Sequence, residues 1–99
     1  MKVIISGSSR VDLVEGFDFY EEQESGAGWY FLQCISAEIE SLKRTGGIHS
    51  KPFKRHHRLI CQRHPFAVFY RILDGDVVVE AVLDSRRNPT WIKRKLRNT

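Results

Sequence analysis

Two runs of apolar residues in the second half of the chain are separated by only two turn residues. Residues 66–73 and 76–84 are rich in β-branched and aromatic side chains, which favour β-strands. The dipeptide between them, Asp74-Gly75, favours a type I′ turn, so the pattern predicts a β-hairpin. Both faces of the first run are largely apolar, which predicts a central strand with Phe66 and Tyr70 in the core.

Two shorter apolar runs predict further strands. Residues 57–63 form the first of them, and it stops before Pro65 because proline has no N–H for the hydrogen-bond ladder. Residues 2–6 form the second, at the start of the chain. We therefore expect a meander of three antiparallel strands and one short strand far ahead of it in the sequence.

The segment between these strands has helical periodicity. Ser9 and Asp12 resemble a capping box, with Asp in place of the usual Glu, and they predict a helix that ends near Ser25. The apolar face expected for this helix holds Leu13, Val14, Phe17 and Tyr20. The helix is therefore expected to be amphipathic and to bury one face.

A second helix is expected after a tight turn at residues 25–28. Its apolar residues recur at steps of three, four and three, the spacing of one buried helical stripe. They are Leu32, Ile35, Ile39 and Leu42. The helix is expected to stop at residues 45–47, where two glycines follow Thr45. Two such helices joined by a short turn predict an αα-hairpin whose apolar stripes need a sheet to cover.

These elements predict one α+β domain over residues 1–99, in the order β-α-α-β-β-β, with the αα-hairpin covering the strand meander. A short C-terminal helix follows, with Asn88 as its cap and Pro89 at its first position. The start of the chain lacks the apolar stretch of a signal peptide, and no run is long enough to span a bilayer, so we expect a cytoplasmic protein without a membrane partner. Cys34 and Cys61 are expected to be reduced packing residues, and no metal or other cofactor is expected.

Charge is distributed unevenly along the chain. Residues 11–42 contain eight Asp and Glu but no Lys or Arg, whereas the chain from Lys43 onward holds fourteen of the sixteen Lys and Arg. With a formal net charge of +4, this composition suggests an anionic partner such as nucleic acid, the ribosome or an acidic polypeptide. The simpler interpretation is two differently solvated faces. The functional one is an anion-binding face on the sheet and C-terminal side.

Arginines are the main candidates for site residues, because guanidinium groups bind phosphate oxygens in pairs and stay charged. The full basic set consists of Lys51, Lys54, Arg55, Arg58, Arg63, Arg71, Arg86 and Arg87. Arg86 and Arg87 follow a strand end, which favours a functional role over solvation or an ion pair with Asp84. Arg58 and Arg63 fit either interpretation, and Arg71, within a strand, fits a structural ion pair equally well.

Histidines and one tryptophan complete the candidate set. Histidine can take a proton from a ribose hydroxyl near neutral pH, which makes His56 and His57 weak catalytic candidates. Their spacing is not specific, and the simpler interpretation is a solvated loop. Trp91 follows a proline-opened turn, so it either pins the C-terminal helix to the sheet or contacts a partner.

Read in order, the sequence contains R-L-x-x-x-R-x-P-F-x-x-x-Y-R over residues 58–71, then D-G-D-V-V-V, A-V-L and R-R-x-P. With F-Y-E-E-Q-E-S-G-A-G at residues 19–28, nearly the whole chain resembles the RelE/ParE family of toxins from bacterial type II toxin–antitoxin systems, the plasmid stabilisation proteins. The resemblance implies a growth-inhibiting toxin, neutralised by an antitoxin whose extended C-terminal segment wraps around it.

The resemblance leaves the target open. RelE-like members cleave mRNA on the ribosome with Lys and Arg from the sheet and a Tyr or His near the C-terminus, and Arg63, Arg86 and Arg87 look like the matching arginines. After Leu83, however, this chain has no Tyr or His, and Trp91 stands roughly where one is expected. Loss of that group lowers the rate by about two to four orders of magnitude.

The chain therefore leans towards the ParE branch, whose members inhibit DNA gyrase without catalysis. A metal-independent mRNA endonuclease that uses His56 or His57, and a non-toxic basic module that binds RNA or protein, are the alternatives. The residues expected to bind an anionic target are Lys54, Arg55, Arg58, Arg63, Arg86, Arg87 and Trp91.

Overall fold

The computed structural model describes all residues, 1–99, and has four strands and three helices. The elements are β1 (Val3–Ile5), α1 (Gly7–Gln23), α2 (Ala27–Thr45), β2 (His57–Ile60), β3 (Phe66–Leu73), β4 (Asp76–Asp84) and α3 (Pro89–Arg97). The α+β class and the order β-α-α-β-β-β followed by a short helix are confirmed. No helix is both long and apolar enough to cross a membrane.

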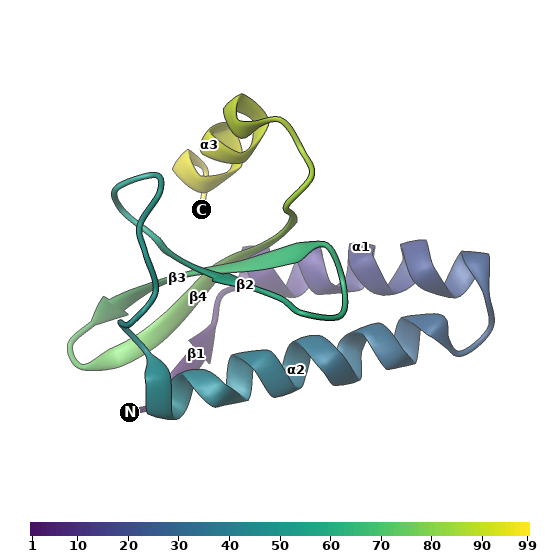
Figure 1. The fold of residues 1–99 in the computed structure, drawn as a ribbon, viewed down its shortest axis with the longest axis horizontal. Helices are drawn as coiled ribbons and strands as arrows, with labels where there is room; N and C mark the ends of the chain where they lie inside the picture. The colour runs from purple at the N-terminus through teal and green to yellow at the C-terminus, as the bar shows by residue number, and fades with distance from the viewer.

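The four strands form one mixed sheet with the order β1-β4-β3-β2. β1 pairs in parallel with β4, although the αα-hairpin, β2 and β3 separate these two strands in the sequence, whereas β2, β3 and β4 form the antiparallel meander. Figure 1 shows α2 beneath the sheet and α1 behind it, with α3 and the loop before β2 on the opposite side. The sheet is therefore covered on both faces.

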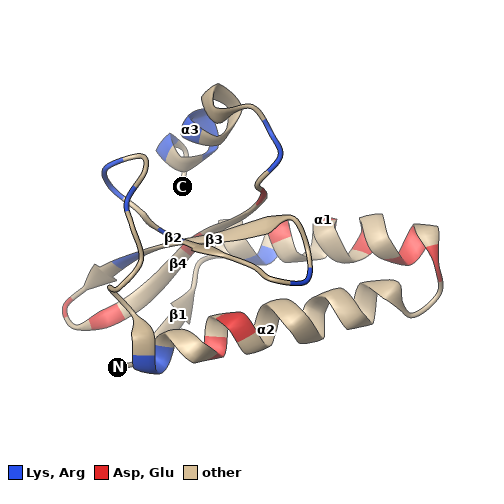
Figure 2. Ribbon diagram, viewed as in Figure 1, with Lys and Arg blue, Asp and Glu red and all other residues tan.

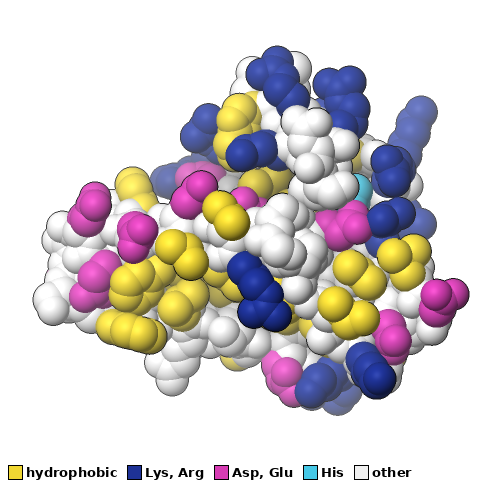
Figure 3. Space-filling model, turned by 180° about the vertical axis from the view of Figure 1, so that it is seen from behind, with side chains coloured by type: hydrophobic (Ala, Val, Ile, Leu, Met, Phe, Trp, Pro, Cys, Tyr) yellow, Lys and Arg dark blue, Asp and Glu magenta, His cyan; other side chains and the backbone are white.

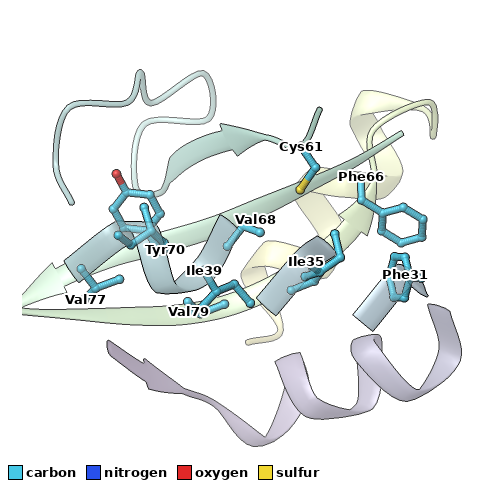
Figure 4. Close-up of a cluster of buried hydrophobic side chains, with 11 residues drawn as sticks. Phe31, Ile35, Ile39, Cys61, Phe66, Val68, Tyr70, Val77 and Val79 are labelled. Atoms are coloured by element: carbon cyan, nitrogen blue, oxygen red, sulfur yellow. The ribbon is translucent and has the colours of Figure 1, made fainter. Parts of the chain in front are cut away.

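The larger core lies between the αα-hairpin and the sheet (Figure 4). The buried stripe of α2 is Phe31, Ile35, Ile39 and Leu42. Phe31, not the expected Leu32, begins this stripe, and Leu32 is only half-buried beside α1. The predictions that Phe66 and Tyr70 lie in the core are confirmed.

A smaller core on the other face holds α3 in place. Ile92 and Leu96 of α3 pack on the small and aromatic residues of that face. The sheet residues involved are Ala67, Phe69, Ala81 and Leu83. β3, which is apolar on both faces, is a central strand of the sheet, as predicted. The Asp74-Gly75 turn has positive φ at both residues (51° and 80°), as a type I′ turn requires.

A β-bulge interrupts the pairing of β3 with β4. Phe69 faces Ala81 and Tyr70 faces Val79, so Glu80 has no partner residue on β3. The extra residue shifts the side-chain alternation along β4, so Val79 and Val82 both reach the larger core. The bulge also places the Glu80 carboxylate beside Arg71.

The start of α1 differs from the capping box expected at Ser9. The helix begins at Gly7, and the Oγ of its N-cap Ser6 accepts the N–H of Ser9 at 3.1 Å. Ser9 is buried and donates its hydroxyl to the carbonyl oxygen of Val79, while Asp12 accepts the N–H of Val82, both at 2.9 Å. β1 is too short to pair with all of β4, so polar side chains of α1 satisfy backbone groups of β4 beyond it.

Glycines let α1 and α2 approach closely. A Cβ atom on Gly28 would lie 2.7 Å from the carbonyl oxygen of Phe17, which belongs to the backbone of α1 and moves only with the helix. A Cβ atom on Gly7, at the start of α1, would meet no neighbouring atom within 4 Å. The tight contact of the hairpin therefore depends on Gly28.

The Gly28→Ala variant is expected to lower the free energy of unfolding by about 1–3 kcal/mol, because the added methyl group forces the two helices apart. Gly7→Ala is the matched control and is expected to change stability by less than about 1 kcal/mol. Urea unfolding followed by circular dichroism measures both variants. Equal stabilities for the two variants would contradict the close contact.

Candidate functional site

The two arginines after β4 have different partners. Arg86 donates from Nε and Nη2 to the carboxylate of Asp84, at 3.1 and 2.8 Å, although its side chain is 64% exposed. The hydrogen bonds and charge of Arg86 hold the pKa of Asp84 below its ordinary value. Arg86 therefore has the ion pair that the sequence left as an alternative, and its charge is matched by the carboxylate of Asp84 at the end of β4.

Arg87 stacks on Trp91 instead. Its guanidinium carbon lies 4.0 Å from the centre of the indole ring, and Lys95 Nζ lies 5.5 Å from the same ring. Trp91 is half-buried and packs against the smaller core, so it pins α3 to the sheet, one of the two roles considered for it. Arg87 is exposed and makes no ion pair, so it keeps its charge for a partner.

Arg63 and Arg58 lie apart from this pair. Arg63 Nη1 is 3.4 Å from the hydroxyl oxygen of Tyr30, and the two residues line a cavity of about 310 Å³ over α2. Arg58 faces Phe69 across the β2–β3 pair, so it lies on the face of the sheet that carries α3, and its buried Nε has no hydrogen-bond partner. The candidate arginines therefore do not lie in one group, and their role in binding an anion stays a prediction.

His56 belongs to a buried ion-pair network. The side chain is 2% exposed, and its Nε2 lies 2.6 Å from Oε1 of Glu80. Arg71 donates to both oxygens of the same carboxylate, at 3.0 and 2.8 Å, so it is a structural ion-pair partner. The interpretation of His56 as a solvated loop histidine is wrong, because this network ties the loop before β2 to the bulge in β4.

Glu80 makes stability depend on pH. Burial alone raises the pKa of this carboxyl group, but the hydrogen bonds and charges of Arg71 and His56 outweigh burial and lower it. A carboxylate with a lowered pKa stabilises the folded state above its ordinary pKa, and this contribution is lost as the pH falls through the lowered value.

The free energy of unfolding of the wild-type protein is therefore expected to fall more steeply than that of the Glu80→Gln variant as the pH falls below about 5. Denaturant titrations at a series of pH values measure the difference. Parallel profiles for the two proteins would show that the carboxylate is not stabilised by its partners.

His57 and His49 enclose the hydroxyl group of Tyr70. His57 stacks on the Tyr70 ring with centroids 4.9 Å apart and donates from Nδ1 to the carbonyl oxygen of His49 at 2.6 Å. The Tyr70 hydroxyl lies 2.6 Å from Nδ1 of His49 and accepts the N–H of Gly47 at 2.9 Å. Burial lowers the pKa of His49. His57 therefore holds the loop in place, and the solvated interpretation is wrong for it as well.

Lysines and arginines meet in a cavity of about 400 Å³ between the loop before β2 and α3. Lys54 and Arg55 come from the loop, and Lys93 and Arg97 come from α3. Figure 2 shows these two basic segments on the same side of the sheet, away from the carboxylates of the αα-hairpin. Lys54 and Arg55 were expected from the sequence, but Lys93 and Arg97 were not, although their spacing along one helix face was an available signal.

The outer face of the αα-hairpin carries an apolar groove of about 410 Å³, lined by Arg10, Leu13, Val14, Phe17, Trp29 and Leu32. Val14 and Trp29 are 59% and 66% exposed, and Phe17 meets Trp29 edge to face at 4.9 Å between ring centroids. Figure 3 shows hydrophobic side chains gathered over the helical hairpin. The apolar face predicted for α1 is thus partly turned to solvent, because Ser9 and Gly16 are the residues that α1 buries.

Comparison with known proteins identifies the fold. The chain matches no protein-family model and no curated protein. Among solved structures it is similar to a chain of the chromosomal ParDE TA system from P. aeruginosa, with a TM-score of 0.72 and 17% sequence identity, over 83% of this chain and 92% of that one. The chain therefore has the fold of that ParDE-system chain, which confirms at the level of fold the resemblance stated from the sequence.

Proposed function

We propose that this chain is the toxin of a type II toxin–antitoxin system, which inhibits growth by binding an essential target and is neutralised by a cognate antitoxin. The observation that carries the proposal is the similarity of fold to a chain of a ParDE system over 92% of that chain. The charge distribution agrees with it, because an acidic hairpin and a basic opposite side offer two surfaces for two different partners.

The proposed target is DNA gyrase, bound without catalysis as in the ParE branch. The histidines that a nuclease would use have other roles, since His56 is bound to Glu80 and His57 holds the loop through Nδ1. Arg86 is paired with Asp84, and Arg63 lies over α2, so these two candidates do not converge on one phosphate. Without a proton-transfer group beside the arginines, RNA cleavage is slower by about two to four orders of magnitude.

A supercoiling assay with purified gyrase and relaxed plasmid tests the target. The purified protein is expected to inhibit supercoiling in proportion to its concentration, and the same protein after heat denaturation serves as the control. Unimpaired supercoiling, together with mRNA cut in a translating ribosome reaction, would overturn the gyrase proposal in favour of the ribosome-dependent nuclease.

The antitoxin is proposed to dock in the apolar groove of the αα-hairpin. Val14 and Trp29 offer apolar surface there, and the groove also contains Arg10, the only Lys or Arg between residues 3 and 42. β1 leaves one edge of the sheet unpaired, with Ile4 exposed. An antitoxin segment with apolar residues and a carboxylate for Arg10 would suit the groove, and its continuation as a strand would suit this edge.

The Val14→Glu variant is expected to escape neutralisation, because it places a carboxylate in the apolar groove. Val11→Glu is the matched control, since Val11 is similarly exposed on α1 but does not line the groove. Binding of the antitoxin, measured by calorimetry, is expected to weaken by about tenfold or more for Val14→Glu. Equal affinities of both variants for the antitoxin would show that the antitoxin does not dock in this groove.

A further inference from the structure

The loop before β2, residues 47–56, is tied to the rest of the fold at few points. His49, Phe53 and His56 are the only residues of this loop that are not exposed. Phe53 packs beside the smaller core, and His56 is bound to Glu80 of β4. His49 is therefore the anchor at the start of the loop. A segment with so few buried contacts opens locally at a low cost in free energy, so each anchor has a large effect on it.

The contact of His49 with Tyr70 requires a neutral imidazole. The Tyr70 hydroxyl oxygen accepts the N–H of Gly47 at 2.9 Å and lies 2.6 Å from Nδ1 of His49. No other group of the structure accepts the single O–H proton, so Nδ1 of His49 is its acceptor, a role that imidazole has only when neutral. Protonation of His49 at Nδ1 would leave the proton of a buried hydroxyl group without a partner, which is unfavourable.

The groups around His49 also oppose a positive charge on it. Burial and then the charge of His57 lower the pKa of His49, and the charge of Glu38 on α2 raises it by less. His57, from β2, stacks on the Tyr70 ring and donates from Nδ1 to the carbonyl oxygen of His49. This bond survives protonation of His57, because the second proton enters at Nε2. His56 faces the carboxylate of Glu80, so a proton on His56 strengthens that contact.

We propose that His49 is a pH-sensitive latch, which holds the start of the loop closed while its imidazole is neutral and releases the loop when the imidazole is protonated. The loop forms one wall of the basic cavity of about 400 Å³, through Lys54 and Arg55, and α3 forms the other. Release of the latch therefore lets one basic wall move away from the other. The latch does not depend on the toxin proposal.

The pH range of the latch follows from the direction of the shift. The pKa of His49 in the closed loop lies below its ordinary value of 6.5, which the side chain regains when the loop opens into water. The closed form is therefore fully favoured above about pH 6.5, and the opening equilibrium rises by at most about tenfold for each pH unit below it. Glu80, whose pKa is lowered from 4.5, acts at a more acidic pH.

Hydrogen exchange of the amides of residues 47–56 in the full chain tests the latch, at about pH 7.5 and about pH 5.5. The amide of Gly47 is the most direct reporter, since it donates to the Tyr70 hydroxyl. Its protection factor, which is corrected for the intrinsic effect of pH on exchange, is expected to fall by about threefold or more at the lower pH. The amides of α2 and β3 serve as the internal control and are expected to keep their protection.

Three variants assign the response to a residue. His49→Asn places an amide oxygen near the position of Nδ1, so it still accepts the Tyr70 proton but does not titrate, and it is expected to keep the loop protected at both pH values. His57→Asn is the matched control, because it can still donate to the carbonyl oxygen of His49, and it is expected to keep the pH response. Tyr70→Phe removes the hydroxyl group and is expected to lower the protection of Gly47 by about fivefold or more already at the higher pH. Thermal unfolding by circular dichroism confirms that the variants remain folded.

Two results would overturn the inference. Equal protection of the wild-type loop at both pH values would show that no latch operates in this range. A pH response that persists in His49→Asn but is lost in His57→Asn would assign the titration to His57 instead. The toxin proposal fails independently of both, because it is tested by growth and by gyrase activity.

Discussion

Phe31→Ala is expected to lower the free energy of unfolding by about 3–5 kcal/mol, because it leaves a cavity at the centre of the larger core. The side chain is fully buried, and its ring meets those of Tyr20, Phe66 and His64 at 5.0–5.2 Å between centroids. The ring also lies against Gly16 of α1. Phe31 therefore joins α1, α2 and the sheet, and its loss weakens all three contacts together.

Phe19→Ala is the matched control for this prediction. Phe19 is 52% exposed on α1, so its truncation is expected to change stability by about 0.5 kcal/mol or less. Because a domain of this size is stable by only about 5–15 kcal/mol, Phe31→Leu is a useful third variant, with an expected loss of about 1–2 kcal/mol. Urea unfolding by circular dichroism measures all three. A loss for Phe31→Ala no larger than that for Phe19→Ala would contradict the packing described.

Glu80→Ala is expected to lower the free energy of unfolding by about 3 kcal/mol. Removing the carboxylate leaves Arg71 without a partner and the buried His56 without its only side-chain hydrogen bond. Arg71 is partly exposed and can regain water, which holds the loss towards the lower end of the range for buried pairs. The loop before β2 is expected to loosen first, because His56 is its link to the sheet.

The control for Glu80 is a surface carboxylate in a helical ion pair. Glu40 contacts Lys43 at 2.7 Å, with both side chains more than half exposed, so Glu40→Ala is expected to lower stability by about 0.5 kcal/mol or less. Denaturant unfolding compares the two variants, and hydrogen exchange of the amides in residues 50–56 reports the loop. Equal losses in the two variants, or unchanged exchange in the loop, would mean that the buried network does not hold the loop.

The sequence was informative where one local pattern determines structure. The spacing of Ile35, Ile39 and Leu42 predicted the buried face of α2, and Asp74-Gly75 predicted the turn between β3 and β4. Asn88 and Pro89 predicted the start of α3 in the same way, and the side chain of Asn88 accepts the N–H of Thr90. In these cases neighbouring residues supply the hydrogen bonds or burial that form the element.

The sequence failed where an element depends on distant residues. Ser9 and Asp12 look like a capping box, but both bond to backbone groups of β4, and Ser6 caps the helix instead. The bulge at Glu80 could not be predicted from alternation either, because every residue of β4 around it suits a regular strand.

The sequence names candidate site residues by type but not their arrangement. The partners of the basic residues depend on the fold, and Arg86 is bound to Asp84. The grouping of Lys54 and Arg55 with Lys93 and Arg97 requires the loop and α3 to lie on the same face of the sheet. Charge composition alone carries no information about that contact.

The central claim is that this chain is a toxin, and induced expression in a bacterial host without an antitoxin tests it most directly. Colony formation is expected to be lost on induction of the wild-type protein and to be less affected by Phe31→Ala, because its lower stability reduces the amount of folded protein in the cell. Undiminished colony formation by cells that accumulate the folded wild-type protein would contradict the claim and would favour a non-toxic basic binding module.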